Sequence, residues 1–409
     1  MKLHLSAPPN SLLRSRIQIT GSKSESNRLL LLQALYPNIT IDNLSNSDDS
    51  EVMQQGLQIH RGEVDIHHAG TAMRFLTAFF ASQEGRDVVL TGSKRMTERP
   101  VKVLVDALRS LGAEIAYVGN EGYPPIQIKG KQLLERKASL PANISSQYIS
   151  ALLLIAARLE NGLELELVGK ITSVPYIDMT LGLLSQLGIQ NSFEGNTITI
   201  APKASVDPVN LVVESDWSSA SYFYSIVALG AVGTEIQLSA YRENSLQGDS
   251  VLAEVYKRFG VETAFREQTV VLRKTRECQL STVDFELSNA PDIAQTIAVS
   301  CFGLGMGCHL SGLHTLKIKE TDRLEALQTE LSKLGAAISV TDRTLTLMPT
   351  TTMKKDVVID TYNDHRMAMA FAPLALKTSL IINDAEVVSK SYPDYWKDLK
   401  SLQFNISEL

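Results

Sequence analysis

The sequence predicts an α/β protein built from six repeated units, arranged as two groups of three. Amphipathic helical segments end in an apolar residue followed by glycine about every 75 residues, at Gly112, Gly188, Gly260 and Gly335. Glycine in this place is the usual left-handed end of a helix. Two short apolar segments separated by a polar turn such as Glu194-Gly195 come next, as in a β-hairpin. The recurring unit is therefore helix, strand, turn and strand.

A second type of helix shares this period. Polar clusters suited to capping a helix N-terminus precede apolar helical runs. These clusters are Ser22–Ser24, Gly70–Thr71, Ser145–Gln147, Asp216–Ser219, Asn289–Asp292 and Asn363–Arg366. The first step, from Ser24 to Thr71, is shorter than the later ones. We expect the hairpin of the first unit to be missing near residues 49–63, and the last unit to be cut off after residues 399–404.

Six units divide most simply into two domains, because three units can close around one core. We expect one domain to comprise residues 1–18 and 216–409, and the other, inserted domain to comprise residues 19–215. The N-terminal segment 2–14 is then free to join the other half, so the chain crosses twice and forms a hinge. Helix N-termini carry partial positive charge, and those of the two halves would face an anion in a cleft.

Composition and charge exclude several functional classes. The 409 residues are 44% hydrophobic and 21% charged, which is typical of a globular protein. The net charge of −6 argues against nucleic acid as a partner. Cys278, Cys301 and Cys308 lack metal-ligand spacing, so we expect reduced structural thiols and, as the histidines also lack such spacing, no metal.

No segment resembles a targeting or membrane sequence. The first residues, Met1–Leu5, are followed by Ser, Pro and Asn, unlike a signal or transit peptide. No apolar run reaches the roughly 18 residues that a membrane span requires. We therefore expect a cytoplasmic protein that does not bind membranes.

The densest charged segment, residues 317–323, runs into an amphipathic helix whose expected N-cap is Thr321. Lys319 and Arg323 place two cations at a helix N-terminus, which already favours anions, so they indicate an anion site. Glu320 beside them is either an ion-pair partner of these cations or a proton-transfer group. A solvated first turn is the alternative interpretation.

Cations also gather at other helix starts, although each costs up to about 1 kcal/mol there. Lys23 and Arg28 flank the first start and Arg366 lies at the sixth, and an anionic ligand would offset this cost. The segment GSKSESNR around Lys23 supplies hydroxyl donors but lacks the Walker A spacing. Arg95 lies in the polar loop 92–100, which is equally consistent with solvation. We expect Arg74 to pair internally.

Two further helix starts carry polar side chains with two possible roles. Ser145, Ser146 and Gln147 either cap a helix or donate to a phosphate, and we expect one serine only to cap. Asp292, after Pro291, is either a first-turn acid or a site carboxylate.

Nine segments, in the same order and over nearly the whole chain, resemble the 5-enolpyruvylshikimate-3-phosphate synthase family of enolpyruvyl transferases. They are GSKSESNR (21–28), AGTAMRFL (69–76), GSKRMTERP (92–100), SSQY (145–148), SVPYIDMTL (173–181), ESDWSSASYF (214–223), IKETDR (318–323), YNDHRMAM (362–369) and SKSYPDYW (389–396). The resemblance implies a two-domain α/β fold in which each domain has three βαβαββ units around a pseudo-threefold axis. Such a domain is an inside-out α/β barrel, and two strands form the hinge.

The resemblance also implies the reaction. The enolpyruvyl (1-carboxyvinyl) group of phosphoenolpyruvate would move to the 5-hydroxyl of shikimate 3-phosphate by addition and elimination, releasing phosphate in the shikimate pathway of aromatic amino acid biosynthesis. No metal or organic cofactor is implied, and we expect a monomer whose partners are these two small molecules. Each substrate carries a carboxylate and a phosphate, which arginine can bind with two hydrogen bonds.

Site residues are carried over where this sequence matches the family's motifs. Those implied to bind phosphoenolpyruvate are Lys23, Gly70, Arg95, Gln147, Arg323, Arg366 and Lys390. Those implied to bind shikimate 3-phosphate are Lys23, Ser24, Arg28, Ser145, Ser146, Gln147, Ser173, Tyr176, Asp292, Thr315 and Lys319. The implied catalytic residues are Asp292 or Lys319, acting on the hydroxyl, and Glu320, acting on the methylene carbon.

The chain departs from the family pattern at three positions. His68 stands where Asn is frequent, Phe75 where Pro is frequent and Thr315 where Asn is common, so the loop at Gly70 and one substrate hydrogen bond differ. The related UDP-N-acetylglucosamine enolpyruvyl transferases carry a reactive Cys in the loop that corresponds to 92–100, and this chain has no Cys before Cys278. A non-catalytic anion-binding protein would not need carboxylates at the site.

Overall fold

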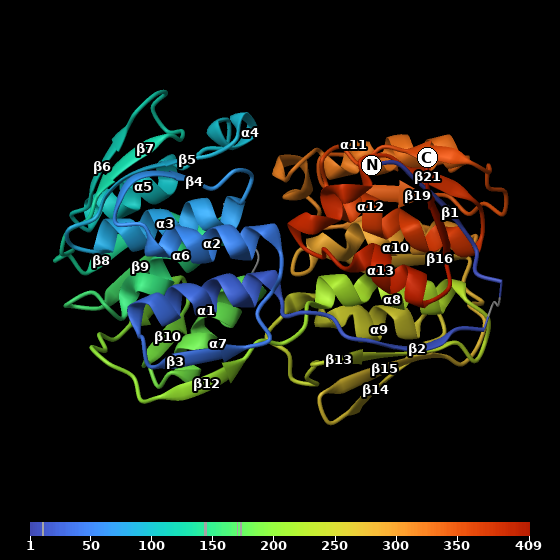
Figure 1. Ribbon diagram of the computed structural model, residues 1–409, viewed down its shortest axis with the longest axis horizontal. Helices are drawn as coiled ribbons and strands as arrows, with labels where there is room; N and C mark the ends of the chain where they lie inside the picture. The colour runs from blue at the N-terminus through green and yellow to red at the C-terminus, as the bar shows by residue number, and fades with distance from the viewer. Residues whose placement is uncertain (10–11, 143–144, 170, 172–173) are drawn as a thin grey trace. The chain divides into compact units, whose positions relative to one another are not determined.

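The computed structural model (Figure 1) describes residues 1–9, 12–142, 145–169, 171 and 174–409. The chain forms two compact units. Unit 1 comprises Met1–Thr20 and Glu214–Leu409, and unit 2 comprises Gly21–Val213. The chain therefore passes from one unit to the other twice.

Unit 1 contains three four-stranded sheets with one common pattern, a parallel pair followed by two antiparallel neighbours. The first sheet consists of β2 (Arg14–Ile17), β13 (Glu235–Ser239), β15 (Thr269–Lys274) and β14 (Val261–Arg266). The second consists of β16 (Thr282–Glu286), β17 (Gly307–Ser311), β19 (Leu345–Leu347) and β18 (Ile338–Val340). The third consists of β20 (Val357–Ile359), β21 (Leu380–Ile382), β1 (Leu3–Ser6) and β22 (Asn405–Glu408).

Unit 2 repeats this pattern in two sheets and shortens it in the third. The complete sheets consist of β4 (Arg61–Asp65), β5 (Asp87–Thr91), β7 (Ile126–Lys129) and β6 (Glu114–Tyr117), and of β8 (Lys137–Pro141), β9 (Leu163–Val168), β11 (Thr197–Ile200) and β10 (Asn191–Glu194). The short sheet is the parallel pair β3 (Ile39–Asp42) and β12 (Val209–Val212). Its hairpin is absent because α2 (Asp48–Gln58) leads directly to β4, which confirms the predicted loss in the first unit.

The N-terminal strands complete two sheets of unit 1. Strand β2 pairs in parallel with β13, and β1 lies between β21 and β22 in antiparallel register. The prediction that the N-terminal segment joins the second half is therefore confirmed. The last unit has one further strand, β22, after residues 399–404, in agreement with the expected truncation, and β1 from the other end of the chain supplies the strand that pairs with it.

The helices of unit 1 form two sets. The central helices are α8 (Trp217–Leu229), α10 (Ala294–Gly303) and α12 (His365–Phe371), and the outer helices are α9 (Leu252–Lys257), α11 (Arg323–Leu334) and α13 (Tyr395–Ser401). Helix α10 packs against α8 and α12, and all of its residues are buried. Short 3₁₀ helices η1 (Gly248–Val251), η2 (Pro291–Ile293), η3 (Leu316–Ile318), η4 (Ala372–Leu376) and η5 (Ala385–Lys390) connect these elements.

Unit 2 is built in the same way around α1 (Lys23–Leu35), α3 (Gly70–Ser82) and α6 (Ser146–Ala156), which contact one another. Its other helices are α2, α4 (Lys94–Thr97), α5 (Lys102–Ser110) and α7 (Val174–Gln186). The apolar runs in the sequence are therefore helices buried on all sides, which explains why they lack a polar face.

The predicted glycine ends of the helices agree with the structure, but several predicted polar N-caps do not: α3 begins at Gly70 itself, after Ala69, and Ser22 before α1 makes no side-chain capping bond. Gly112, Gly188, Gly260 and Gly335 all have positive φ, between 67° and 105°. The predicted N-cap Thr321 is wrong, because the carboxylate of Asp322 accepts from the backbone N–H groups of Leu324 and Glu325 at 3.1 and 3.2 Å. Asp322 immediately precedes the helix, so its side chain reaches those donors. No helix among the described residues has the length and apolar character to cross a membrane.

Candidate active site

The site in unit 1 is organised by Arg323, at the first position of α11. Its side chain is 2% exposed, and each of its three nitrogens donates a hydrogen bond to a carboxylate. Nε donates to Asp364 at 2.6 Å, Nη1 to Asp292 at 2.8 Å and Nη2 to Glu320 at 2.8 Å. One buried guanidinium therefore fixes three carboxylates that come from three different segments.

Asp292, on η2, receives further cations. The Nζ atom of Lys319 lies 3.3 Å from Oδ1 of Asp292, and Nη2 of Arg366 lies 3.5 Å from Oδ2. Arg366 also donates from Nη1 to the backbone carbonyl of Asp292 at 3.0 Å. The structure thus brings together all three predicted catalytic residues. Lys319 pairs with Asp292, and Arg323 connects Asp292 to Glu320.

Arg366, at the start of α12, is held from a second side. Its Nη2 donates to the hydroxyl of Ser218 on α8 at 3.2 Å, and that hydroxyl donates to Asp249 on η1. Lys390, at the end of η5, donates from Nζ to the carbonyl of Asn363 at 2.7 Å. Lys390 therefore contacts the chain just before α12, whereas Arg366 reaches from α12 to η2 and α8.

The electrostatics follow from burial and from these partners. Burial alone would lower the pKa of Arg323, but Asp364, Glu320 and Asp292 outweigh it and raise that pKa above its ordinary value, so the guanidinium stays charged. Burial, and then the nearby charge of Asp292, raises the pKa of Asp249 to about 6. Asp249 is therefore an acid that can change its charge near neutral pH.

Two partly exposed groups give this cluster access to a ligand. The side chains of Lys319 and Glu320 are each 30% exposed, whereas Asp364 is fully buried.

Thr315 has a buried hydroxyl, and that hydroxyl has no hydrogen-bond partner among the described residues.

In unit 2, Arg28 of α1 is buried and bonded mainly to neutral groups. Its nitrogens donate to the hydroxyls of Thr180 and Ser150 at 2.8 and 2.9 Å and to the carbonyl of Ser24 at 2.7 Å. Burial lowers the pKa of Arg28 to about 10, although Tyr176 and the charge of Glu25 on the same helix oppose this shift, so Arg28 remains protonated at neutral pH. Because burial penalises this charge, an anion at the start of α1 would be favoured.

Two more predicted residues of α1 lie near that end. The Nζ atom of Lys23 lies 3.4 Å from the carboxylate of Asp49 on α2, and both side chains are largely buried. Ser24 is half-buried, and its carbonyl accepts the hydrogen bond from Arg28.

The starts of α3 and α6 meet through their side chains. Gln147 donates from Nε2 to the hydroxyl of Thr71 at 3.1 Å, and Ser145 is the N-cap of α6. A Cβ atom on Gly70 would lie 2.6 Å from Nη1 of Arg99, so glycine leaves room for a guanidinium at the start of α3. Ser146 is buried one residue after the cap.

The remaining predicted residues of unit 2 are less constrained. Arg95 is 60% exposed and pairs with Glu98 at 3.3 Å. Tyr176 accepts from Arg28 at its carbonyl, and its ring lies 6.0 Å from that guanidinium. The ring of Phe75, one of the departures from the family pattern, also lies near the Arg28 guanidinium, at 5.4 Å. Ser173 lies outside the described residues.

Arg74 has the internal role that the sequence suggested, with different partners. It donates to the carbonyls of Gly70 and Pro100 at 3.1 and 3.2 Å and lies over the ring of Tyr148. Carbonyls therefore take the place of the expected internal acid.

Sequence reasoning missed three carboxylates of these networks. Asp364 lies in the segment 362–369, which carries part of the family resemblance, and is the N-cap of α12, a signal that could have marked it. Asp49 and Asp249 have no such signal, because only the fold places them beside Lys23 and Ser218.

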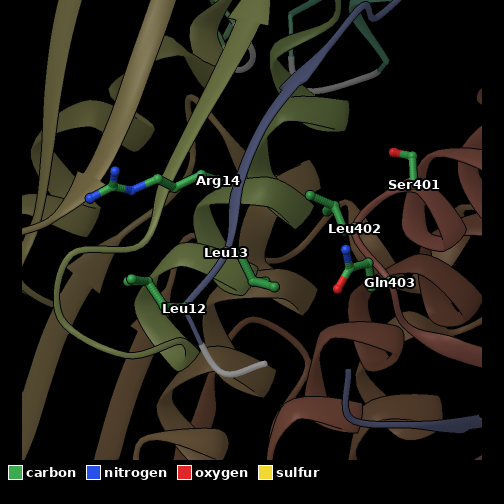
Figure 2. Close-up of a pocket in the computed structure, with 6 residues that line it drawn as sticks. All are labelled: Leu12, Leu13, Arg14, Ser401, Leu402 and Gln403. Carbon is green, nitrogen blue, oxygen red and sulfur yellow. The ribbon is translucent and has the colours of Figure 1, made fainter. Parts of the chain in front are cut away.

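A separate hollow of about 410 Å³ occurs in unit 1, away from the predicted residues. Figure 2 shows its lining of Leu12, Leu13, Arg14, Ser401, Leu402 and Gln403. It contains no carboxylate and one cation, so it does not suit the predicted chemistry. Within the described part of the chain, no group of three His, Cys, Asp or Glu side chains is arranged to hold a metal ion.

Comparisons with known proteins agree with the fold and the motifs. A model of the EPSP synthase (3-phosphoshikimate 1-carboxyvinyltransferase) family matches residues 59–399. A 3-phosphoshikimate 1-carboxyvinyltransferase of Bacteroides fragilis strain YCH46 is 44% identical over 99% of both chains. One from Photobacterium damsela subsp. piscicida is 38% identical over 97% of this chain and 99% of the relative.

Solved structures show the same fold. An EPSP synthase from Acinetobacter baumannii has a TM-score of 0.81 at 21% identity and covers 100% of both chains. The enolpyruvyl transferase NikO from Streptomyces tendae has a TM-score of 0.76 at 14% identity, over 99% of this chain and 98% of that chain. The predicted two-domain enolpyruvyl transferase-like α/β fold is therefore confirmed.

Proposed function

Since the chain belongs to the EPSP synthase (3-phosphoshikimate 1-carboxyvinyltransferase) family, we propose that it transfers the enolpyruvyl group of phosphoenolpyruvate to the 5-hydroxyl of shikimate 3-phosphate. The products are 5-enolpyruvylshikimate 3-phosphate and phosphate, within the shikimate pathway. Units 1 and 2 correspond to the two proposed domains. The protein would act in the cytoplasm, as a monomer, on dissolved small molecules.

The observation that carries this proposal is the arrangement of Asp292, Glu320 and Lys319 around Arg323. Addition of a hydroxyl to the enol double bond requires loss of the hydroxyl proton and gain of a proton at the methylene carbon. Elimination of phosphate then removes a proton from that same carbon, which restores the double bond. Two proton-transfer groups in fixed positions serve such a sequence, and Arg323 fixes both carboxylates at 2.8 Å.

The exposures of these groups suggest how the roles divide. Glu320 is 30% exposed and is the carboxylate that a substrate carbon can approach, so we assign it to the methylene carbon. Asp292 is 9% exposed and lies 3.3 Å from Lys319, so this pair suits the hydroxyl proton. The Lys319 ammonium can also stabilise negative charge that develops on the attacking oxygen.

The residues proposed to bind the substrate anions come from both units. In unit 2, the buried charge of Arg28 and the donors of Lys23, Ser24, Ser145, Ser146 and Gln147 support binding of a phosphate ester. In unit 1, Arg366 and Lys390 supply cations beside the acids. Arg323 has its nitrogens already engaged by three carboxylates, so its main role is to orient Asp292 and Glu320 rather than to hold phosphoenolpyruvate.

The test is the release of phosphate by the purified protein. We expect release from phosphoenolpyruvate only when shikimate 3-phosphate is added, with 5-enolpyruvylshikimate 3-phosphate as the second product. Glu320→Gln under the same conditions is the matched control for contaminating activity. Release with UDP-N-acetylglucosamine in place of shikimate 3-phosphate would overturn the assignment, and release with neither acceptor would indicate a phosphatase.

A further inference from the structure

We propose that Asp249 is a positioning residue for Arg366 and acts through the hydroxyl of Ser218. This inference rests on the proposed function, because it takes Arg366 to be a ligand of phosphoenolpyruvate. Asp249 lies on η1, outside the segments that carry the family resemblance. A chain of two hydrogen bonds connects Asp249 to Arg366.

The chain crosses three elements of unit 1. Ser218, in the first turn of α8, donates its hydroxyl hydrogen to Oδ2 of Asp249. The same hydroxyl oxygen accepts from Nη2 of Arg366, on α12, at 3.2 Å. A serine hydroxyl has one hydrogen and two lone pairs. Because Asp249 takes the hydrogen, the lone pairs of Ser218 are left for the guanidinium.

The direction of the Ser218 hydroxyl is therefore set by the charge of Asp249. A carboxylate only accepts, so it keeps Ser218 as an acceptor toward Arg366. A protonated acid or an amide at this position can donate to Ser218 instead. The hydroxyl hydrogen would then point elsewhere, including toward Arg366, and the guanidinium would lose one of the contacts that orient it.

Burial makes this control effective. Asp249 is 6% exposed, so water does not replace the hydrogen bond to Ser218. Three charged groups act on it: Asp292 and Asp216 raise its pKa, whereas Arg366 lowers it. Helix α8 carries no charged residue, and α9, which also packs against η1, carries Glu254 and Lys257 with largely exposed side chains.

Asp249 could also do no more than attach η1 to the start of α8. Such a structural role would lower stability and would change the use of both substrates alike. The hydrogen-bond chain from Asp249 through Ser218 to Arg366, called the relay below, makes a different prediction. Arg366 is a proposed ligand of phosphoenolpyruvate and not of shikimate 3-phosphate. Kinetics with each substrate varied in turn separate the two roles.

The experiment compares Asp249→Asn, Ser218→Ala and the double variant with wild type. We expect each single variant to raise KM for phosphoenolpyruvate about tenfold, as for one lost hydrogen bond to a charged group, with KM for shikimate 3-phosphate within about twofold. The double variant should match the single variants, because both changes break the same relay. Glu254→Gln, which removes an exposed carboxylate from the neighbouring helix, is the control and should match wild type.

The pH profile gives a second readout. The pKa of Asp249 is raised to about 6, so its charge is lost as pH falls through 6, and wild-type kcat/KM for phosphoenolpyruvate should fall there more steeply than that of Asp249→Asn. The substrate phosphate also titrates near pH 6, but its effect is common to both proteins.

The outcomes are distinct. Additive effects in the double variant, or equal rises in both KM values, would overturn the relay while leaving the enzyme assignment intact. If Asp249→Asn fails to fold, Ser218→Ala alone decides, because its KM for phosphoenolpyruvate must still rise selectively. If the wild-type protein has no transferase activity, the proposed function is refuted, and the relay is refuted with it.

Discussion

Replacing Arg323 by Met should destabilise unit 1 far more than a typical substitution does. The change removes the cation that Asp292, Glu320 and Asp364 share and leaves an apolar side chain of similar length. Asp364 is fully buried, so the loss of its partner at 2.6 Å leaves an uncompensated charge. Breaking such a buried pair costs about 3–5 kcal/mol.

The other two carboxylates add little to this cost. Asp292 keeps Lys319 and Arg366 as partners, and Glu320 is 30% exposed, so water screens it and its pair with Arg323 is worth less than about 1 kcal/mol. We therefore expect a loss of about 4 kcal/mol in the free energy of unfolding. With a urea dependence of about 3 kcal/mol per molar, the midpoint should fall by more than about 1 M.

Tryptophan fluorescence during urea unfolding measures this loss in the right part of the molecule. The chain has two tryptophans, and both Trp217 and Trp396 are buried in unit 1. Arg343→Met is the matched control, because Arg343 is exposed in the same unit and its loss should change the free energy of unfolding by less than about 0.5 kcal/mol. Equal midpoints for Arg323→Met and Arg343→Met would refute the claim that one guanidinium holds the three carboxylates.

Three further predictions concern activity and conformation. Glu320→Gln keeps an oxygen for Arg323 and should bind both substrates normally while kcat falls at least about 100-fold in the phosphate-release assay; affinity falling as much as rate would make Glu320 a scaffold. Gly70→Ala should leave the free energy of unfolding within about 0.5 kcal/mol, since the three atoms nearest the new Cβ belong to the end of the flexible Arg99 side chain, but should raise KM for phosphoenolpyruvate; an unchanged KM would exclude close approach of the substrate to Gly70. Shikimate 3-phosphate should compact the protein in small-angle scattering, and an unchanged radius of gyration would count against hinge closure.

Periodicity predicted the fold well because the repeated units obey local rules. The glycines at 112, 188, 260 and 335 end helices in any context, so their spacing revealed the units directly. The end of the chain was harder to predict. The last antiparallel pair combines β1 with β22, which are at opposite ends of the chain, and no local pattern shows that two such segments pair.

The candidate site was predictable in its residue types but not in its pairing. The charged run around Lys319 and the run around Arg366 were recognisable as functional segments. Their partners depend on tertiary contacts: Asp249 reaches Arg366 only through Ser218, and Asp49 reaches Lys23 only because α2 packs against α1. The same limit explains the role of Arg323, which the sequence placed at an anion site and the structure surrounds with carboxylates.

The charges of the two units indicate different tasks. In unit 1 the three cations Lys319, Arg323 and Arg366 face Asp292, Glu320 and Asp364, so the cluster is nearly neutral and suits proton transfer more than anion capture. In unit 2 Arg28 is charged and buried, and its described partners are hydroxyls, carbonyls and aromatic rings. Because burial penalises the charge of Arg28 more than the nearby Glu25 offsets it, an arriving phosphate would gain free energy there. We therefore infer that unit 2 supplies the main attraction for the phosphate ester, whereas unit 1 supplies the acids and bases of the reaction.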